Sequence, residues 1–238
     1  MALTLYGAIL SPFVRKIRIQ LGEFNMAHEH VAVPPMQQPD WYYAISPLGR
    51  IPAIQDGDIA LADSAVIAQY LHEKYLHEQD QPEKRLHHSS TAATLYGCNA
   101  GEAARVRWLE KYADYELAPY ATFTVFSQRF LEPLKGGRPD EQAVELALQK
   151  QLPPLFDYLE KELGEQRYFL GDTFSIADIA VVSQLINLAH VGALIDAERW
   201  PGLASLLSRV TGRCSVSALL PGEHQLLAHY AARRHAPA

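Results

Sequence analysis

Residues 46–70 read SPLGRIPAIQDGDIALADSAVIAQY. Pro52 opens a short apolar run that can form only the start or the edge of a strand, because proline has no amide proton to donate. Asp56-Gly57 is a strong signal for a two-residue hairpin, so residues 59–61 should pair back antiparallel to that strand. Asp63-Ser64 then starts a segment whose apolar residues return with helical spacing. The stretch predicts a hairpin followed directly by a helix.

These elements would offer a ligand three kinds of contact. If the Ile51-Pro52 peptide bond is cis, the backbone of Ile51 turns outward, and its amide and carbonyl are free to pair with an extended peptide. The free amides at the start of the Ser64 helix point toward an anion, and the helix dipole favours a carboxylate there. The hairpin, the backbone edge and the helix N-terminus together predict a site for a small anionic peptide.

Here the sequence resembles the thioredoxin-like half of the glutathione S-transferases. Gly-Arg-Ile-Pro at 49–52 and Asp-Ser at 63–64 are similar to that family's cis-proline and glutamyl-binding positions, and the resemblance covers nearly the whole chain. It implies glutathione as the co-substrate. The glutathione-binding residues that it implies are Gln38, Arg50, Ile51, Pro52, Asp63 and Ser64.

Each of these residues has an implied role. Ile51 would pair with the cysteinyl backbone of glutathione, and Asp63 and Ser64 would hold the glutamyl amine and carboxylate. Arg50 or Gln38 would bind the glycyl carboxylate. Asp63 could instead be only a favourable charge at a helix start.

The composition is that of a globular protein in two parts without a strong charge. The chain has 238 residues, 48% of them hydrophobic, which is enough material for two buried cores. Its net charge is −6, and residues 1–78 carry five Lys and Arg against eight Asp and Glu. Because neither part is basic, we expect no nucleic acid and no anionic membrane surface as a partner. The two cysteines, Cys98 and Cys214, suit a reducing compartment, and residues 1–13 do not resemble a signal peptide, so we expect a cytoplasmic protein.

The residues before the hairpin complete a small α/β domain. Residues 3–6 alternate as in a strand, and Ser11-Pro12 predicts a helix start, with serine as the cap and proline at the first helical position. Residues 28–33 form a second expected strand, and a strand, a helix and a strand of this length indicate a parallel crossover unit. We therefore predict that residues 1–78 form a thioredoxin-like glutathione-binding domain with a mixed sheet.

The rest of the chain is predicted to be all-α. Residues 79–89 are polar and are expected to be a linker, and residues 90–238 are expected to form a helical bundle domain with a hydrophobic acceptor site. Its expected helices cover 90–117, 120–134, 140–163, 176–190 and 201–213. Ser175 and Asp178 form a capping box before the fourth of these helices. The tail Arg233-Arg234-His235 is expected to be disordered.

Ser11 is the candidate catalytic residue. A free thiol titrates at about pH 8.5, so a bound glutathione must be helped to ionise near neutral pH. The Ser11 hydroxyl can donate to the sulfur while the first helix presents its positive end, and Ser-Pro-Phe-Val-Arg-Lys at 11–16 resembles the family's serine-type motif. Serine could also be a cap and nothing more. Tyr6 is the alternative, because tyrosine-type members place the activating hydroxyl near the end of the first strand. Cysteine-type members have a thiol at the places that Leu10 and Ser11 occupy here. A mixed disulfide with a protein cysteine would therefore need Cys98 or Cys214, which both lie outside this domain.

A dense aromatic series suits an apolar acceptor site. Its members are Trp108, Tyr112, Tyr115, Tyr120, Phe123, Phe126 and Phe130. Aromatic residues at helical spacing are also common in cores, and Tyr112, Tyr115 and Phe123 are the candidates that we prefer for acceptor binding. The histidines lack the spacing of metal ligands, so we expect no metal.

The resemblance implies a glutathione S-transferase that activates the glutathione thiol for attack on a small hydrophobic electrophile, a peroxide or a disulfide, with a role in detoxification. Glutathione peroxidase or disulfide reductase activity would follow from the last two acceptors. Two alternatives stay open: a non-catalytic member that serves as an interaction or ligand-binding module, and a glutathione-dependent isomerase or dehalogenase. The resemblance also implies a homodimer.

Overall fold

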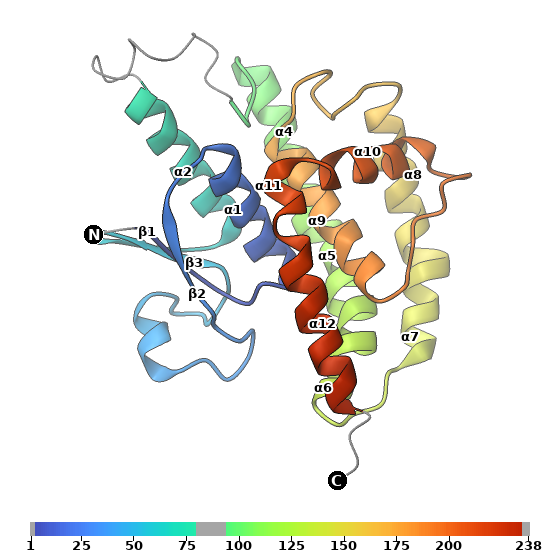
Figure 1. Cartoon of the computed structure of the whole chain (residues 1–238). Helices are drawn as coiled ribbons and strands as arrows, with labels where there is room; N and C mark the ends of the chain where they lie inside the picture. Colours follow the sequence, from blue (N-terminus) through green and yellow to red (C-terminus); the bar gives the residue numbers. More distant parts are fainter. Residues whose placement is uncertain (1–2, 80–93, 235–238) are drawn as a thin grey trace.

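The computed structural model describes residues 3–79 and 94–234. Figure 1 shows a small sheet with its helices on one side of the molecule and a larger group of helices beside it. The first helix, α1 (Pro12–Glu23), lies between the two parts and packs against α9 (Ile176–His190), a helix of the second part. This is the predicted arrangement of a thioredoxin-like domain and a helical domain.

The sheet has four strands in the order β2-β1-β3-β4. The strands are β1 (Leu3–Tyr6), β2 (His28–Val31), β3 (Ala53–Asp56) and β4 (Ile59–Ala62). β1 pairs with β2 in parallel, and the pairs β1–β3 and β3–β4 are antiparallel. The mixed sheet and the parallel crossover are thereby confirmed, although the second strand ends at Val31, two residues earlier than predicted.

Three helical segments accompany the sheet. They are α1, the 3-10 segment η1 (Asp40–Ala44) and α2 (Ser64–Gln79). Leu3 and Leu5 of β1 are buried, as are Ile17 of α1 and Ile67 of α2, and all four belong to one core cluster. The apolar side chains that alternate along the strand and those that recur with helical spacing therefore pack in one core.

The hairpin turn lies one residue later than the sequence signal indicates. Asp56 pairs with Ile59, so the two-residue loop is Gly57-Asp58 rather than Asp56-Gly57. Gly57 takes a φ of +61°, a conformation that favours glycine at the first loop position. The predicted antiparallel return of residues 59–61 is confirmed.

The second part consists mainly of helices joined by loops. Its segments are α4 (Ala100–Tyr112), η2 (Ala113–Leu117), α5 (Ala118–Tyr120), η3 (Ala121–Leu131), α6 (Glu132–Leu134), α7 (Glu141–Leu146), η4 (Ala147–Gln151), α8 (Leu152–Leu163), α9, α10 (Pro201–Thr211), α11 (Cys214–Ser217) and α12 (Leu220–Arg234). The segments η2, η3 and η4 are wider, π-helical turns. Residues 100–134 form one uninterrupted helical run, which includes Pro119 between two of these wide segments.

Two predictions about this part were wrong. Of the helix expected over 90–117, residues 90–93 lie outside the described residues and 94–99 are not helical: α4 begins at Ala100, because Gly97 has a φ of +80° and Asn99 caps the helix by accepting from the amide of Glu102. The tail residues 233 and 234, expected to be disordered, belong to α12. Residues 80–89 of the predicted linker and the tail residue His235 lie outside the described residues.

α9 is the centre of the second part. Its N-terminus carries the predicted capping box: the Ser175 amide donates to Asp178 Oδ2 at 2.8 Å, and the Ser175 hydroxyl donates to the same atom at 2.7 Å. Both residues are fully buried. Within residues 3–79 and 94–234, no helix has the length and apolarity that crossing a membrane requires.

Candidate functional site

The register of the sheet brings the predicted site segments to one edge. Tyr6 at the end of β1 pairs with Ala53 at the start of β3, and Ala53 pairs with Ala62 at the end of β4. The segments 7–11, 51–52 and 63–64 therefore leave the sheet side by side. No two of these segments are neighbours in the sequence, and the sheet alone brings them together.

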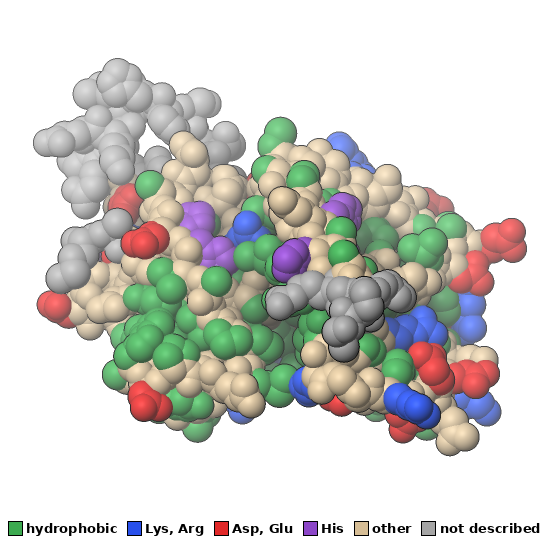
Figure 2. All heavy atoms as spheres, turned by 60° about the horizontal axis from the view of Figure 1, so that its bottom comes forward, with side chains coloured by type: hydrophobic (Ala, Val, Ile, Leu, Met, Phe, Trp, Pro, Cys, Tyr) green, Lys and Arg blue, Asp and Glu red, His purple; other side chains and the backbone are tan. Residues whose placement is uncertain are grey.

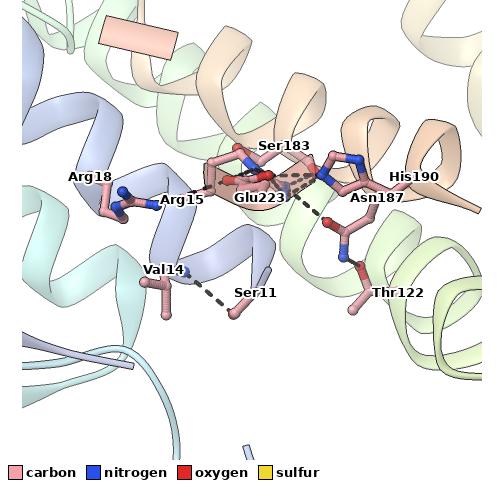
Figure 3. A network of polar contacts seen from close by, with 9 residues as sticks. All are labelled: Ser11, Val14, Arg15, Arg18, Thr122, Ser183, Asn187, His190 and Glu223. Atoms are coloured by element: carbon pink, nitrogen blue, oxygen red, sulfur yellow. Dashed lines mark hydrogen bonds and ion pairs between the residues drawn. The ribbon is translucent and has the colours of Figure 1, made fainter. Parts of the chain in front are cut away.

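Ser11 is the N-cap of α1. Its Oγ accepts from the amide of Val14 at 3.4 Å, a long hydrogen bond, and its side chain is partly exposed (Figure 3). Pro12 occupies the first helical position, as the sequence predicts. A weakly bound hydroxyl at the positive end of a helix can still donate its proton to an anion.

Gly7 brings the loop before Ser11 against the proline segment. Its φ is +152°, and a side-chain carbon at this position would lie 2.4 Å from Val14 Cγ2 and 3.4 Å from Ile51 Cβ. The Ile51-Pro52 peptide bond is cis. Among the described residues, the structure shows no hydrogen bond to the amide or the carbonyl of Ile51, and the residue is partly exposed. An extended peptide could pair with that backbone.

Asp63 and Ser64 stand at the N-terminus of α2. Asp63 has a φ of +93°, and its Oδ1 accepts from the amides of Ala65 at 3.0 Å and Val66 at 3.2 Å. The carboxylate is therefore the cap of this helix, and its second oxygen has no hydrogen bond within the described ranges. Ser64 is buried below it. One carboxylate oxygen and the helix N-terminus remain to meet the charged groups of a ligand.

Arg50 and Gln38 differ in freedom. The Arg50 side chain is exposed, whereas its carbonyl accepts hydrogen bonds from Tyr42 and Ser46. Gln38 donates from Nε2 to the carbonyl of Gly49 at 2.6 Å and so secures the loop before Arg50. The Arg50 guanidinium is thus available to a ligand carboxylate, while the described position of Gln38 supports the loop.

The side chain of Tyr6 contacts the sheet and η1. Its ring packs at an angle against Trp41 and Tyr42, and its hydroxyl lies 3.4 Å from Gln55 Oε1 on β3. These partners come from the sheet and from η1.

The three acceptor candidates lie in different surroundings. Phe123 is 62% exposed and stacks on Phe13 of α1, with ring centroids 6.0 Å apart. Tyr112 instead packs on Tyr158 of α8, and Tyr115 is exposed beside Lys111. Phe123 is therefore the candidate that meets the helix carrying Ser11.

A buried charge cluster beside the site was missed by the sequence analysis. Arg15 has no exposed surface, and its Nε and Nη2 donate to Glu223 of α12 at 2.9 and 2.6 Å (Figure 3). His190 Nε2 lies 2.8 Å from the same carboxylate. Burial would raise the pKa of Glu223, but Arg15 and His190 outweigh it and hold that pKa below its usual value. Residue 223 lies in a stretch for which we predicted no helix, so no local sequence pattern indicated that Glu223 would be buried against α1.

A second buried cation links α1 to the helical part. Lys16 Nζ donates to Glu110 Oε1 at 2.9 Å and to Asp114 Oδ2 at 2.7 Å. Burial alone would lower the pKa of Lys16, but these two carboxylates raise it. Arg15 and Lys16 of α1 thus face the second domain rather than water.

In the described ranges there is no group of three or more histidine, cysteine or acidic side chains that could hold a metal ion. A surface cavity of about 590 Å³ lies along α2, lined by Tyr70, Glu73, Lys74, His77 and Glu78, and none of these is a predicted site residue.

Models of two protein families match this chain. The model described as glutathione S-transferase, N-terminal domain, matches residues 5–79, and the model described as glutathione S-transferase, C-terminal domain, matches residues 141–209. The two matches fall on the sheet domain and on the helical part.

Individual proteins are similar over most of their length. Glutathione S-transferase 3 of Zea mays is 34% identical over 180 residues, which are 74% of this chain and 73% of the relative. Glutathione S-transferase F13 of Arabidopsis thaliana is 30% identical over 202 residues, which are 82% of this chain and 86% of the relative. The crystal structure of glutathione transferase F7 from Populus trichocarpa superposes with a TM-score of 0.77 at 24% identity, over 93% of this chain and 99% of that one.

Proposed function

This chain belongs to the glutathione S-transferase family, and from that premise we propose that it activates the thiol of glutathione for attack on a small hydrophobic electrophile. Glutathione is the co-substrate in this proposal, and Ser11 is the catalytic residue. Lowering the pKa of a thiol by one unit requires about 1.4 kcal/mol of preference for the thiolate. A hydroxyl donor and a helix dipole together can supply that amount.

The observation that carries the proposal is the meeting of three segments at one edge of the sheet. The pairing of Tyr6, Ala53 and Ala62 sets the N-cap of α1, the backbone of Ile51 and the N-terminus of α2 side by side. A tripeptide with an amine, two carboxylates and a thiol has polar groups that can bind to each of these three segments. Ile51 would pair with its cysteinyl backbone, next to Pro52.

The glutamyl end and the glycyl end of glutathione would each bind to separate residues. Asp63 would accept from the glutamyl amine, and Ser64 and the α2 amides would bind the glutamyl carboxylate. Arg50 would pair with the glycyl carboxylate, and Gln38 would hold the Arg50 loop in place by its hydrogen bond to Gly49.

Phe13 and Phe123 support an apolar acceptor beside the thiol. They stack across the domain boundary, and Phe13 follows Ser11 by two residues. Tyr112 and Tyr115 would contribute only at the edge of such a site, because Tyr112 packs on α8 and Tyr115 lies beside Lys111. An acceptor of this kind favours conjugation over reduction of a peroxide or a disulfide.

The test is a calorimetric titration of glutathione into the protein in buffers of different ionisation heats, which counts the protons released on binding. Release in the wild type that is lost in Ser11→Ala is the expected result. Tyr6→Phe is the matched control, since it removes the rival hydroxyl and should leave the release unchanged. Release that persists in Ser11→Ala and disappears in Tyr6→Phe would transfer the role to Tyr6, and absence of binding would leave the non-catalytic alternative.

The proposed assembly is a homodimer. Large apolar side chains around η1 are exposed, namely Met36, Trp41, Tyr43 and Leu48. Figure 2 shows hydrophobic side chains gathered on the side of the molecule where Figure 1 places this segment. Burial of such a patch against a second copy would remove it from water. The mass in solution, measured by light scattering, tests the dimer directly. A cytoplasmic location is proposed as well, from the two cysteines and the sequence of residues 1–13.

A further inference from the structure

The C-terminal helix α12 holds the segment around Ser11 at two points. One is apolar: Leu10, the residue before Ser11, is buried in a cluster with Phe130, and Tyr230 of α12 packs against it. The rings of Phe130 and Tyr230 meet edge to face, with centroids 5.9 Å apart and an interplanar angle of 74°. Tyr230 of α12 therefore packs against the cluster that holds Leu10, the residue before the serine, with Phe130 as the ring that it contacts.

The other point is ionic and lies one helical turn after Ser11. The carboxylate of Glu223 takes three contacts of 2.6 to 3.0 Å from the guanidinium of Arg15. The third guanidinium nitrogen, Nη1, donates to the carbonyl of Ser183 at 2.8 Å and to Asn187 Oδ1 at 2.9 Å, both on α9. All three nitrogens of the planar Arg15 guanidinium are hydrogen-bonded, which fixes its orientation. A rotation or a shift of α1 would therefore break these hydrogen bonds.

The histidine of the cluster closes the arrangement. Burial, together with Arg15 and His224, lowers the pKa of His190 despite its hydrogen bond to Glu223. Its Nε2 lies 2.8 Å from Glu223 Oε2, and since a carboxylate oxygen accepts, the ring nitrogen is the donor of this hydrogen bond. Glu223 thus accepts from both Arg15 and His190, with no exposed surface of its own.

We propose that α12 is a positioning element for the thiolate site, with Glu223 and Tyr230 as the positioning residues for Ser11. The inference rests on the proposed function of Ser11 and deepens it. Segment 10–15 carries the serine hydroxyl between two anchors that both belong to the last helix of the chain. Neither anchor has to touch glutathione, because each acts through the backbone that orients the hydroxyl.

The substitution Glu223→Gln separates position from charge. An amide offers one oxygen where Arg15 and His190 together use two, and its NH2 group would face donors, so the fork of Arg15 has to move. Loss of position weakens the hydroxyl contact and raises the pKa of the bound thiol. Loss of a negative charge alone would lower that pKa, because an uncompensated Arg15 cation favours a nearby thiolate. The two explanations therefore predict shifts of opposite sign.

The experiment measures the ultraviolet absorbance of bound glutathione thiolate against pH, without any second substrate. The matched control is Glu23→Gln, because Glu23 is the last residue of α1 and accepts from Arg213 at 2.9 and 2.6 Å, at the far end from Ser11. In Glu223→Gln we expect the pKa of the bound thiol to rise by about one unit, which is a tenfold change in its ionisation constant. In Glu23→Gln we expect no change.

Tyr230→Ala is the second variant, and it keeps the buried ion pair and should fold even if Glu223→Gln does not. It should raise the thiol pKa in the same direction. An unchanged or lowered thiol pKa in both α12 variants, or an equal rise in Glu23→Gln, would overturn the inference alone, provided that the wild type forms thiolate and Ser11→Ala does not. A wild type that binds glutathione without forming thiolate would overturn the proposed function and this inference with it.

Discussion

Lys16 is predicted to be the strongest single link between the two domains. Its ammonium group lies 2.9 Å from Glu110 Oε1 and 2.7 Å from Asp114 Oδ2, and its side chain is 1% exposed. Lys16→Met keeps the length of the aliphatic stem and removes the charge. The two carboxylates then stand one helical turn apart in a buried site with no cation between them.

The magnitude follows from that burial. Removing one partner of a buried ion pair costs about 3–5 kcal/mol, because the remaining charge is neither solvated nor compensated. In a protein of this size each kcal/mol lowers the Tm by about 2–4 °C, so we expect a fall of roughly 6–20 °C at neutral pH.

Thermal unfolding followed by circular dichroism at neutral pH measures this prediction. Lys135→Met is the matched control, since Lys135 pairs with Glu132 at 2.8 Å on the surface and is 45% exposed. It should cost less than about 1 kcal/mol. The reasoning would be refuted if Lys16→Met lost no more stability than Lys135→Met.

Three further predictions concern the site and the core. Gly7→Ala should weaken glutathione binding and lower the Tm, measured by calorimetry and circular dichroism, because the new carbon would lie 2.4 Å from Val14 Cγ2; normal binding would mean that the loop adapts. Asp63→Asn keeps a capping oxygen but removes the charge, so the Tm should hold while the Kd for glutathione rises about 10- to 100-fold; a Tm loss at constant Kd would leave only the cap role. Burial raises the pKa of Asp178 to about 6, above its usual 3.8. The folded state therefore takes up a proton between about pH 6 and 4 while the unfolded chain does not, and the stability that Asp178 contributes should increase by roughly 3 kcal/mol as the pH falls through this window. Urea unfolding of the wild type and Asp178→Asn should show this difference growing on acidification, and a constant difference would contradict it.

Local patterns in the sequence were sufficient wherever the partners lie within a few residues. The serine cap and first-position proline of α1, the hairpin of β3 and β4 and the capping box of α9 were all predicted, because each depends on hydrogen bonds that span two to four residues. The family resemblance came from the same short motifs.

Charges on α1 show where such patterns fail. The apolar spacing of α1 places Arg15 and Lys16 away from its hydrophobic face, which is the usual position for solvated side chains. The structure buries both, because α1 is covered by the sheet domain on one side and by α9 and α11 on the other, while Glu223 of α12 binds Arg15. A helical period identifies one buried face and carries no information about a second domain that covers the other.

The sequence by itself determined the two domains, the order of most helices and strands, and the motifs that indicate glutathione. Only the tertiary structure decided that Arg15 meets Glu223 across 208 residues of chain and that Lys16 meets Glu110 across 94. Ion pairs of this kind form where two independently patterned surfaces dock, and the alignment of those surfaces depends on the packing of the whole molecule. For the same reason, the contact of α12 with the Ser11 segment becomes visible only once the last helix is in place.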